Sequence, residues 1–165
     1  MSKINIFCFG FGQVAEGFIN KLIQEKKDFD LSITSRQETH QIELNNFKIT
    51  SYHFTDDKFD SSIDKKLKEA NYILISIPPI EGKDIVAKYF DKNLQGITNC
   101  KWITYLSATS VYGDHKGEWV NENSTTKPTS PNGSSRLAAE NTWKKLSNKN
   151  KYPLQIFRLA GIYSN

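Results

Sequence analysis

A glycine-rich turn near the start of the chain is the first feature that could do chemistry. Residues 10–15 read Gly-Phe-Gly-Gln-Val-Ala, a G-x-G-x-x-A pattern. In such a turn Gly10 permits a sharp reversal, Gly12 lets a pyrophosphate approach the backbone, and Ala15 lets the following helix pack closely on the preceding strand. The free N–H groups at the start of that helix then bind phosphate. The pattern therefore predicts dinucleotide binding, with a plain strand-to-helix turn as the alternative.

The elements around this turn are those that the motif requires. Residues 4–9 form a short apolar run, typical of a buried strand, and apolar residues recur at helical spacing from Val14 to Ile23. A glycine turn between a strand and a helix, at the front of a β-α-β unit, is much more specific than the same letters elsewhere.

The residues after the second predicted strand, 31–34, select the cofactor. NAD sites place an acidic residue there, where it accepts a hydrogen bond from the ribose 2′-hydroxyl. This chain instead has Ser35 and Arg36, and Asp30 precedes the strand. Arg36 could pair with a 2′-phosphate, with Ser35 as a hydrogen-bond partner. We therefore expect NADP(H) to be favoured over NAD(H); a solvated loop arginine is the alternative.

Length and composition indicate one soluble globular domain. The chain has 165 residues, 38% of them hydrophobic and 24% charged, and a net charge of +4. Cys8 and Cys100 lie far apart, which excludes a disulfide framework or a cysteine zinc site. No apolar run reaches the ~20 residues of a membrane helix, and no signal peptide is evident. We expect a cytoplasmic protein with no metal, no membrane contact and, because the lysines are scattered, no nucleic-acid partner.

Strand-like and helical segments alternate along the chain. Apolar runs predict six strands, at residues 4–9, 31–34, 49–53, 72–77, 102–106 and 154–159. Helical patterns lie between them, at residues 14–23, 60–70, 85–94 and 133–146, and residues 107–131 form a long polar loop. Continuous apolar strands alternating with helices predict a mostly parallel sheet with helices on both faces.

Three further segments carry a family resemblance. Residues 107–113 read SATSVYG, residues 131–140 read PNGSSRLAAE, and residues 157–163 read FRLAGIY. Together with the glycine turn they resemble the extended and atypical short-chain dehydrogenase/reductases, the NAD(P)-dependent epimerase/dehydratase group. The resemblance implies one three-layer Rossmann domain over residues 1–165, with strand order 3-2-1-4-5-6. The cofactor site is expected to comprise Gly10, Phe11, Gly12, Gln13, Val14, Ser35, Arg36, Ile77, Pro78, Ser107 and Arg136.

The catalytic positions of that family are altered. The family uses a Ser or Thr, a Tyr and a Lys; the matching positions here are Ala108, Asn132 and Arg136. Alanine has no hydroxyl, and asparagine does not titrate near neutral pH, so neither replaces the lost group. Arginine keeps the positive charge in a different geometry. Thr109 and Tyr112 are weak substitutes, and no catalytic residue of the usual kind is expected.

The segment at residues 157–163 resembles the point where the family's chain enters its substrate-binding region. The sequence ends two residues later. We therefore expect the family's C-terminal substrate-binding domain to be absent. A naturally short product, a decayed gene and a cut chain are equally compatible with this pattern.

Three functions stay open at this point. The first is an NADP(H)-binding protein without the family's Ser-Tyr-Lys catalysis. The second is an active oxidoreductase or epimerase with atypical catalytic groups. The third is a cofactor-free interaction module or vestigial fragment.

The resemblance also implies a homodimer through the helices near 83–94 and 133–146. Leu137, Trp143 and Leu146 could supply an apolar face for it; core packing is the alternative.

Overall fold

The structure, a computed structural model, describes residues 3–93 and 97–163. Its centre is a seven-stranded sheet in the order β3-β4-β2-β1-β5-β6-β7. All neighbouring pairs are parallel except β3 and β4, which are antiparallel. The strands are β1 (Ile4–Phe9), β2 (Phe29–Ser35), β3 (His40–Leu44), β4 (Phe47–His53), β5 (Tyr72–Ile75), β6 (Trp102–Ala108) and β7 (Leu154–Leu159).

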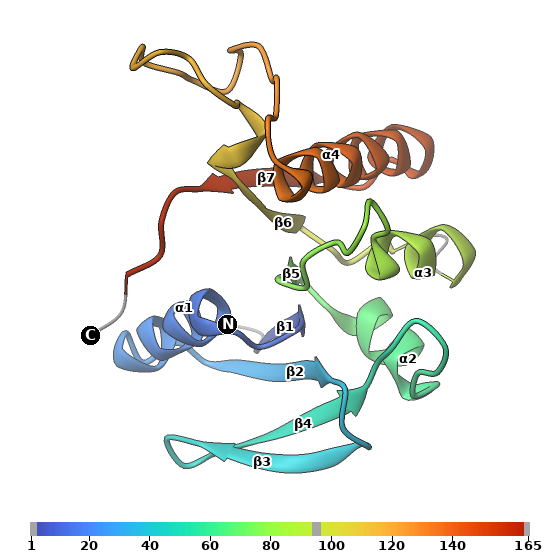
Figure 1. Cartoon of the computed structure of the whole chain (residues 1–165). Helices are drawn as coiled ribbons and strands as arrows, with labels where there is room; N and C mark the ends of the chain where they lie inside the picture. The colour runs from blue at the N-terminus through green and yellow to red at the C-terminus, as the bar shows by residue number, and fades with distance from the viewer. Residues whose placement is uncertain (1–2, 94–96, 164–165) are drawn as a thin grey trace.

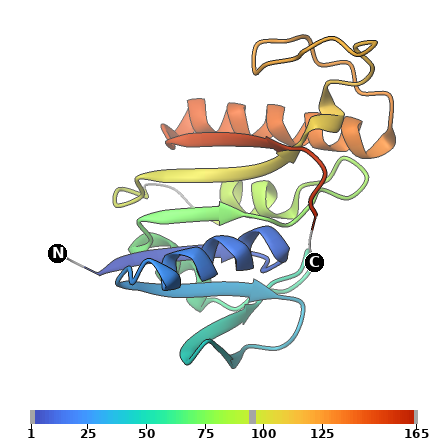
Figure 2. The same ribbon diagram turned by 90° about the vertical axis from the view of Figure 1, so that its left-hand side faces the viewer.

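Helices cover both faces of the sheet (Figures 1 and 2). One face carries α1 (Gln13–Gln24), and the other carries α2 (Ser62–Glu69), α3 (Ile85–Asn93) and α4 (Pro131–Asn150). A single turn of 3-10 helix, η1 (Thr109–Val111), follows β6. Three layers with a parallel sheet place the carboxyl ends of β1, β2, β4, β5 and β6 along one edge, which is where α/β proteins of this kind bind ligands.

The expected Rossmann architecture is confirmed. The six predicted strands pair in parallel in the predicted order, and the structure adds one strand, β3, at the edge beside β4. Its polar, alternating sequence carries no continuous apolar run. A two-residue turn, Asn45 and Asn46, joins β3 to β4, and both residues have positive φ (49° and 67°). Asparagine is favoured in such hairpin turns, so this signal was present in the sequence.

Two apolar clusters, one on each face of the sheet, hold the layers together. On the three-helix face Phe7, Phe9 and Tyr105 pack against α2, α3 and α4. Trp143 of α4 is fully buried there, against Phe90 and Tyr105. The smaller cluster packs α1 against β1, β2 and β4. Burial of large aromatic side chains dominates the stability of such a core.

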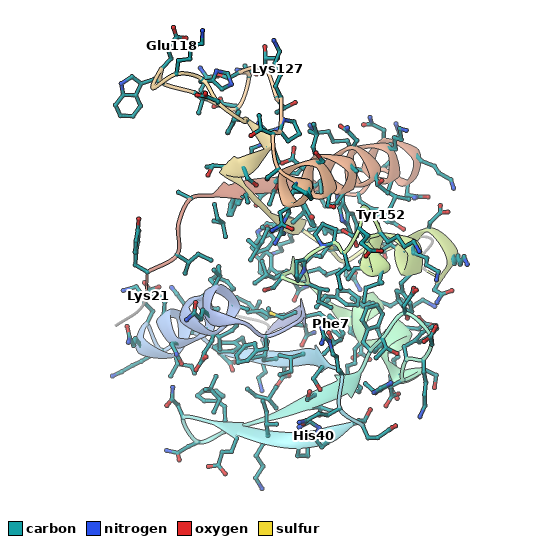
Figure 3. The ribbon with its side chains drawn as sticks, viewed as in Figure 1. Phe7, Lys21, His40, Glu118, Lys127 and Tyr152 are labelled. Atoms are coloured by element: carbon teal, nitrogen blue, oxygen red, sulfur yellow. The ribbon has the colours of Figure 1, made fainter. Side chains whose placement is uncertain are left out.

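Residues 113–130 form a loop that projects from the body beyond β6 (Figures 1 and 3; Glu118 and Lys127 are labelled). At its neck the Lys127 N–H donates to the Tyr112 carbonyl at 3.2 Å, and His115 Nε2 lies 3.1 Å from the Thr125 carbonyl oxygen. Gly113 has φ +74°, and a Cβ there would lie 1.8 Å from the Lys127 carbonyl oxygen. Only glycine fits at this position, where the two ends of the loop pass close to each other.

In the part of the chain that the structure describes, no helix has the length and apolar character needed to cross a membrane. The end of the predicted helix at Leu94 lies outside the described residues.

Candidate functional site

The glycine turn joins β1 to α1 at the carboxyl edge of the sheet. Gly10 has φ +78°, and a Cβ there would come within 2.9 Å of Ile77 Cγ1. Its N–H donates to Thr34 Oγ1 at 2.9 Å, which ties the turn to the end of β2. Gly12, by contrast, has φ −89°, and a Cβ there would meet nothing closer than Ser76 Oγ at 3.9 Å. The fold therefore requires glycine at position 10, whereas the backbone would accept alanine at position 12.

Gly12 is the N-cap of α1, and no side chain caps the helix there. The first N–H groups of a helix lack partners within the helix. Together with the helix dipole, these groups make the start of α1 suited to an anion such as a pyrophosphate.

A first cleft of about 670 Å³ opens in front of this turn. It runs along the ends of β1, β2, β4 and β5, and Figure 1 shows these ends side by side. Its lining comprises Gly10, Phe11, Gly12, Ile33, Thr34, Ser35, Arg36, Phe54, Thr55, Asp56, Ser76, Ile77, Pro78, Ile80, Lys83 and Ile85. Seven of the residues predicted to bind the cofactor therefore border one cleft: Gly10, Phe11, Gly12, Ser35, Arg36, Ile77 and Pro78.

Arg36 lies free at the β2 end of the first cleft. Its side chain is exposed, and among the described residues no carboxylate lies within ion-pair distance. Ser35 Oγ, in the same lining, accepts from Ser51 Oγ at 3.0 Å and from the Gln37 N–H at 3.3 Å. The next carboxylate along the chain, Glu38, does not border the cleft and is paired with Lys58 at 3.0 Å. The cleft therefore offers a cation where an NAD site needs an acceptor.

A second cleft of about 680 Å³ adjoins the first, and the two share Pro78 and Ile80. The second cleft is lined by Pro78, Pro79, Ile80, Glu81, Ala108, Ser110, Ser130, Pro131, Asn132, Ser135 and Arg136. The resemblance matches Ala108, Asn132 and Arg136 to catalytic residues, and the three border one cleft although the first and the last are 28 positions apart in the sequence. Arg136 Nη1 donates to the Leu106 carbonyl, which anchors the guanidinium at the end of β6.

Several predicted residues lie away from these clefts. Ser107 is buried and donates to Glu140 Oε1 at 2.6 Å, so its hydroxyl faces α4 and borders neither cleft. Gln13 and Val14 lie in the first turn of α1, and neither borders either cleft. Thr109 is exposed in η1 and borders neither cleft.

Tyr112 is 7% exposed, and its ring lies under the Arg158 guanidinium at 4.7 Å. It borders a separate hollow of about 500 Å³ against β7, not the cleft that holds Ala108 and Asn132. The structure therefore does not bring Tyr112 to the position of the family's catalytic groups.

A buried ion pair links α4 to β7. Arg158 donates to both oxygens of Glu140, at 3.0 and 2.7 Å, and the Glu140 side chain is fully buried. Burial disfavours the charged carboxyl, but the hydrogen bonds from Arg158 and Ser107 outweigh it, so the net effect lowers the pKa of Glu140. Sequence reasoning missed this pair because nothing in the local pattern joins residues on a helix and on a later strand.

Ile80 and Lys83 border the first cleft, and sequence reasoning missed them too. Both lie in the irregular connection between β5 and α3, where no periodicity points to a role. Ile80 is 62% exposed although it is large and apolar, and it stands where the two clefts meet. In the described part of the chain no group of three or more His, Cys, Asp or Glu residues could hold a metal ion.

No family model and no curated protein matches the sequence. Solved structures do match it. A functionally unknown conserved protein from Silicibacter pomeroyi DSS is 28% identical, with a TM-score of 0.74; the match covers 96% of this chain and 52% of that one. UDP-glucuronic acid 4-epimerase from Bacillus cereus, in complex with NAD, is 16% identical, with a TM-score of 0.69 and coverages of 96% and 57%.

UDP-N-acetylglucosamine 4-epimerase from Methanobrevibacter ruminantium M1, in complex with UDP-N-acetylmuramic acid, is 18% identical, with a TM-score of 0.72 and coverages of 96% and 55%. The chain has the Rossmann-like fold of these epimerases. It spans about half the length of the solved structures that it matches.

Proposed function

We propose that this chain is an NADP(H)-binding protein of the short-chain dehydrogenase/reductase type. The observation that carries the proposal is the composition of the first cleft, which combines the Gly10–Gly12 turn, the uncapped start of α1 and the unpaired Arg36. A dinucleotide needs a phosphate-binding backbone, an apolar surface for its base and a group that recognises the adenosine ribose. All three occur along one continuous edge of the sheet.

Each part of the cofactor has a matching part of the cleft. The Gly12 backbone and the first turn of α1 would hold the pyrophosphate. Phe54, Ile77 and Ile85 give the cleft an apolar wall suited to the adenine ring. Arg36 would pair with the 2′-phosphate, since a guanidinium binds phosphate through two parallel hydrogen bonds.

The epimerase neighbour that holds NAD supports dinucleotide binding by this fold. The preference for NADP(H) rests on Arg36 alone among the predicted residues, because the cleft has no carboxylate at the end of β2. The nicotinamide end would extend past Pro78 and Ile80 toward the second cleft, since these two residues border both.

We further propose that the family's Ser-Tyr-Lys chemistry is lost. The lining of the second cleft contains no Tyr, His, Lys or Cys, and its titratable groups are Glu81 and Arg136. The buried phenol of Tyr105 lies outside that lining, and burial raises its pKa, the opposite of what a tyrosine base requires. Without a group that exchanges a proton near neutral pH, a hydride acceptor in this cleft would lack its usual acid or base.

The test of this loss is NADPH consumption with a panel of aldehydes, ketones and nucleotide sugars. The account predicts a flat trace for the wild type, even where NADPH binding is saturated. The alternative, an oxidoreductase or epimerase with atypical groups, predicts turnover with at least one substrate. Glu81→Gln then separates the cases: an activity that this variant abolishes would assign the acid–base role to Glu81 and would overturn the proposal.

A cofactor-free interaction module is the remaining alternative, and a homodimer remains a proposal. The structure buries Trp143 and Leu146 in the core, so of the three residues considered for an apolar face only the half-buried Leu137 is partly accessible. The exposed residues of α3 and α4 include Lys88, Lys145 and Lys149, so a dimer through these helices would need polar contacts. Sedimentation velocity at low and high salt tests this, because a polar interface dissociates as salt rises.

A further inference from the structure

The connection between β5 and α3 carries a second unpaired cation on the first cleft, Lys83. Its side chain is exposed, and among residues 3–93 and 97–163 no carboxylate lies within ion-pair distance of its Nζ. The first cleft has three ionisable side chains, those of Arg36, Asp56 and Lys83. Asp56 is bound to Lys88 Nζ at 2.7 Å, and that hydrogen bond lowers the pKa of its carboxyl. The Lys83 charge also contributes to the lowered pKa of Asp56, but neither Lys83 nor Arg36 forms an ion pair with a described carboxylate. The two groups that border the cleft without an ion pair are therefore both cations.

The backbone around Lys83 is fixed from both sides. Before it, Ile80 and Lys83 exchange two backbone hydrogen bonds of 2.9 and 2.8 Å across a tight turn. The turn residues Glu81 and Gly82 both have positive φ (49° and 74°), and the Gly82 N–H donates to Ser135 Oγ of α4 at 3.0 Å. A turn tied to a helix in this way presents its side chains from a constant position.

After Lys83, the next residue caps α3. Asp84 Oδ1 accepts from the N–H groups of Val86 and Ala87 at 3.0 and 2.8 Å, and Oδ2 accepts from Trp143 Nε1 at 3.0 Å. The Asp84 carboxylate thus accepts hydrogen bonds from the backbone of α3 and from the Trp143 indole of α4. Lys83 therefore stands between a hydrogen-bonded turn and a capped helix, and its exposed side chain borders the first cleft.

We infer that Lys83 and Arg36 together form the binding site for the adenosine 2′-phosphate. This inference rests on the proposed function. Two cations suit a phosphate monoester, which carries about −1.5 to −2 charges near neutral pH, better than they suit a neutral ribose hydroxyl. Lys83 approaches from the β5–α3 connection and Arg36 from the end of β2, so the two cations reach the cleft from different elements. Lys83 is thereby a specificity-determining residue that the sequence motifs do not reveal.

The test compares NADP⁺ and NAD⁺ binding to the wild type and to Lys83→Gln by calorimetry. A hydrogen bond to a charged group accounts for roughly tenfold or more in affinity. We therefore expect Lys83→Gln to weaken NADP⁺ binding about tenfold and to change NAD⁺ binding less than twofold. Adenosine 2′,5′-bisphosphate and adenosine 5′-phosphate, used as short probes, should show the same contrast.

The matched control is Lys145→Gln. Lys145 is an exposed lysine that borders the groove between α3 and α4 but not the first cleft. Its removal changes the net charge equally and should alter neither affinity. The double variant Arg36→Met with Lys83→Gln should lose less NADP⁺ affinity than the product of the single losses, because both groups contact one phosphate.

The outcomes separate this inference from the proposed function. If Lys83→Gln weakens both nucleotides equally, or neither, then the role of Lys83 in 2′-phosphate recognition is overturned while NADP(H) binding stands. If the folded wild type binds neither nucleotide, both the inference and the proposed function fail. A normal melting temperature of Lys83→Gln would show that a loss of affinity does not come from unfolding.

Discussion

The two turn positions that Gly10 and Gly12 occupy suit glycine for different reasons, although the motif treats both positions alike. Gly10 has positive φ and a close neighbour in Ile77, whereas Gly12 has neither. The fold therefore depends on Gly10, whereas glycine at position 12 suits both the N-cap of α1 and the proposed approach of a pyrophosphate. Substitutions at the two positions should therefore have different effects on stability and on nucleotide binding.

We expect Gly10→Ala to lower the free energy of unfolding by about 1–3 kcal/mol, because it places a side chain in a left-handed conformation against Ile77. Gly12→Ala should lower stability by no more than about 1 kcal/mol, the usual cost of alanine at an N-cap. It should weaken nucleotide binding at least tenfold, since the new methyl group lies where the pyrophosphate is proposed to approach. Urea unfolding and calorimetry measure the two effects. Unchanged nucleotide affinity in Gly12→Ala would contradict the proposed position of the pyrophosphate.

At the scale of the elements, the Glu140–Arg158 pair joins α4 to β7, an edge strand that β5 and β6 separate from β1 and the glycine turn. Removing one partner of a buried pair leaves an uncompensated charge, which typically destabilises by about 3–5 kcal/mol. We expect a loss of that size for Glu140→Ala in urea unfolding. The double variant Glu140→Leu with Arg158→Met, which removes both charges and keeps apolar volume, should recover most of it. A double variant as unstable as the single one would show that the packing of these two side chains, and not the unpaired charge, accounts for the loss of stability.

The same pair makes stability depend on pH. The folded-state pKa of Glu140 lies below its ordinary value of 4.5. The ionised carboxyl therefore stabilises the fold fully above that ordinary value, and this stabilisation is lost as the pH falls through the lower, folded-state pKa. Thermal unfolding between pH 7 and pH 3 should show a smaller decrease for Glu140→Gln than for the wild type. Parallel pH curves for the two proteins would contradict this assignment.

The elements also show what sequence reasoning can reach. The parallel strands were predictable because each is a continuous apolar run, and the glycine turn was predictable because a strand and a helix flank it. β3 was missed because an edge strand with one solvated face has no such run, although Asn45 and Asn46 marked its turn. Lys83 and Glu140 were not predictable, because their roles depend on partners brought near by the fold and not by local spacing.

At the scale of the whole molecule, two adjoining clefts lie along one edge of the sheet. The first combines the glycine turn, the start of α1 and Arg36, whereas the second brings together Ala108, Asn132 and Arg136, which the sequence resemblance matches to catalytic positions. We propose that such a protein would bind a cofactor beside the projecting loop at residues 113–130 without a proton donor of the usual kind. Nucleotide binding is therefore the claim on which the rest depends.

The most direct test is calorimetric titration of the purified wild-type protein with NADP⁺ and NAD⁺, repeated with Arg36→Met. The account predicts that NADP⁺ binds at least tenfold more tightly than NAD⁺. It also predicts that Arg36→Met removes most of this difference while NAD⁺ affinity changes little, because only the 2′-phosphate contact is lost. Equal binding of the two nucleotides by the wild type would contradict the NADP(H) preference, and no binding of either by the folded protein would contradict the account as a whole.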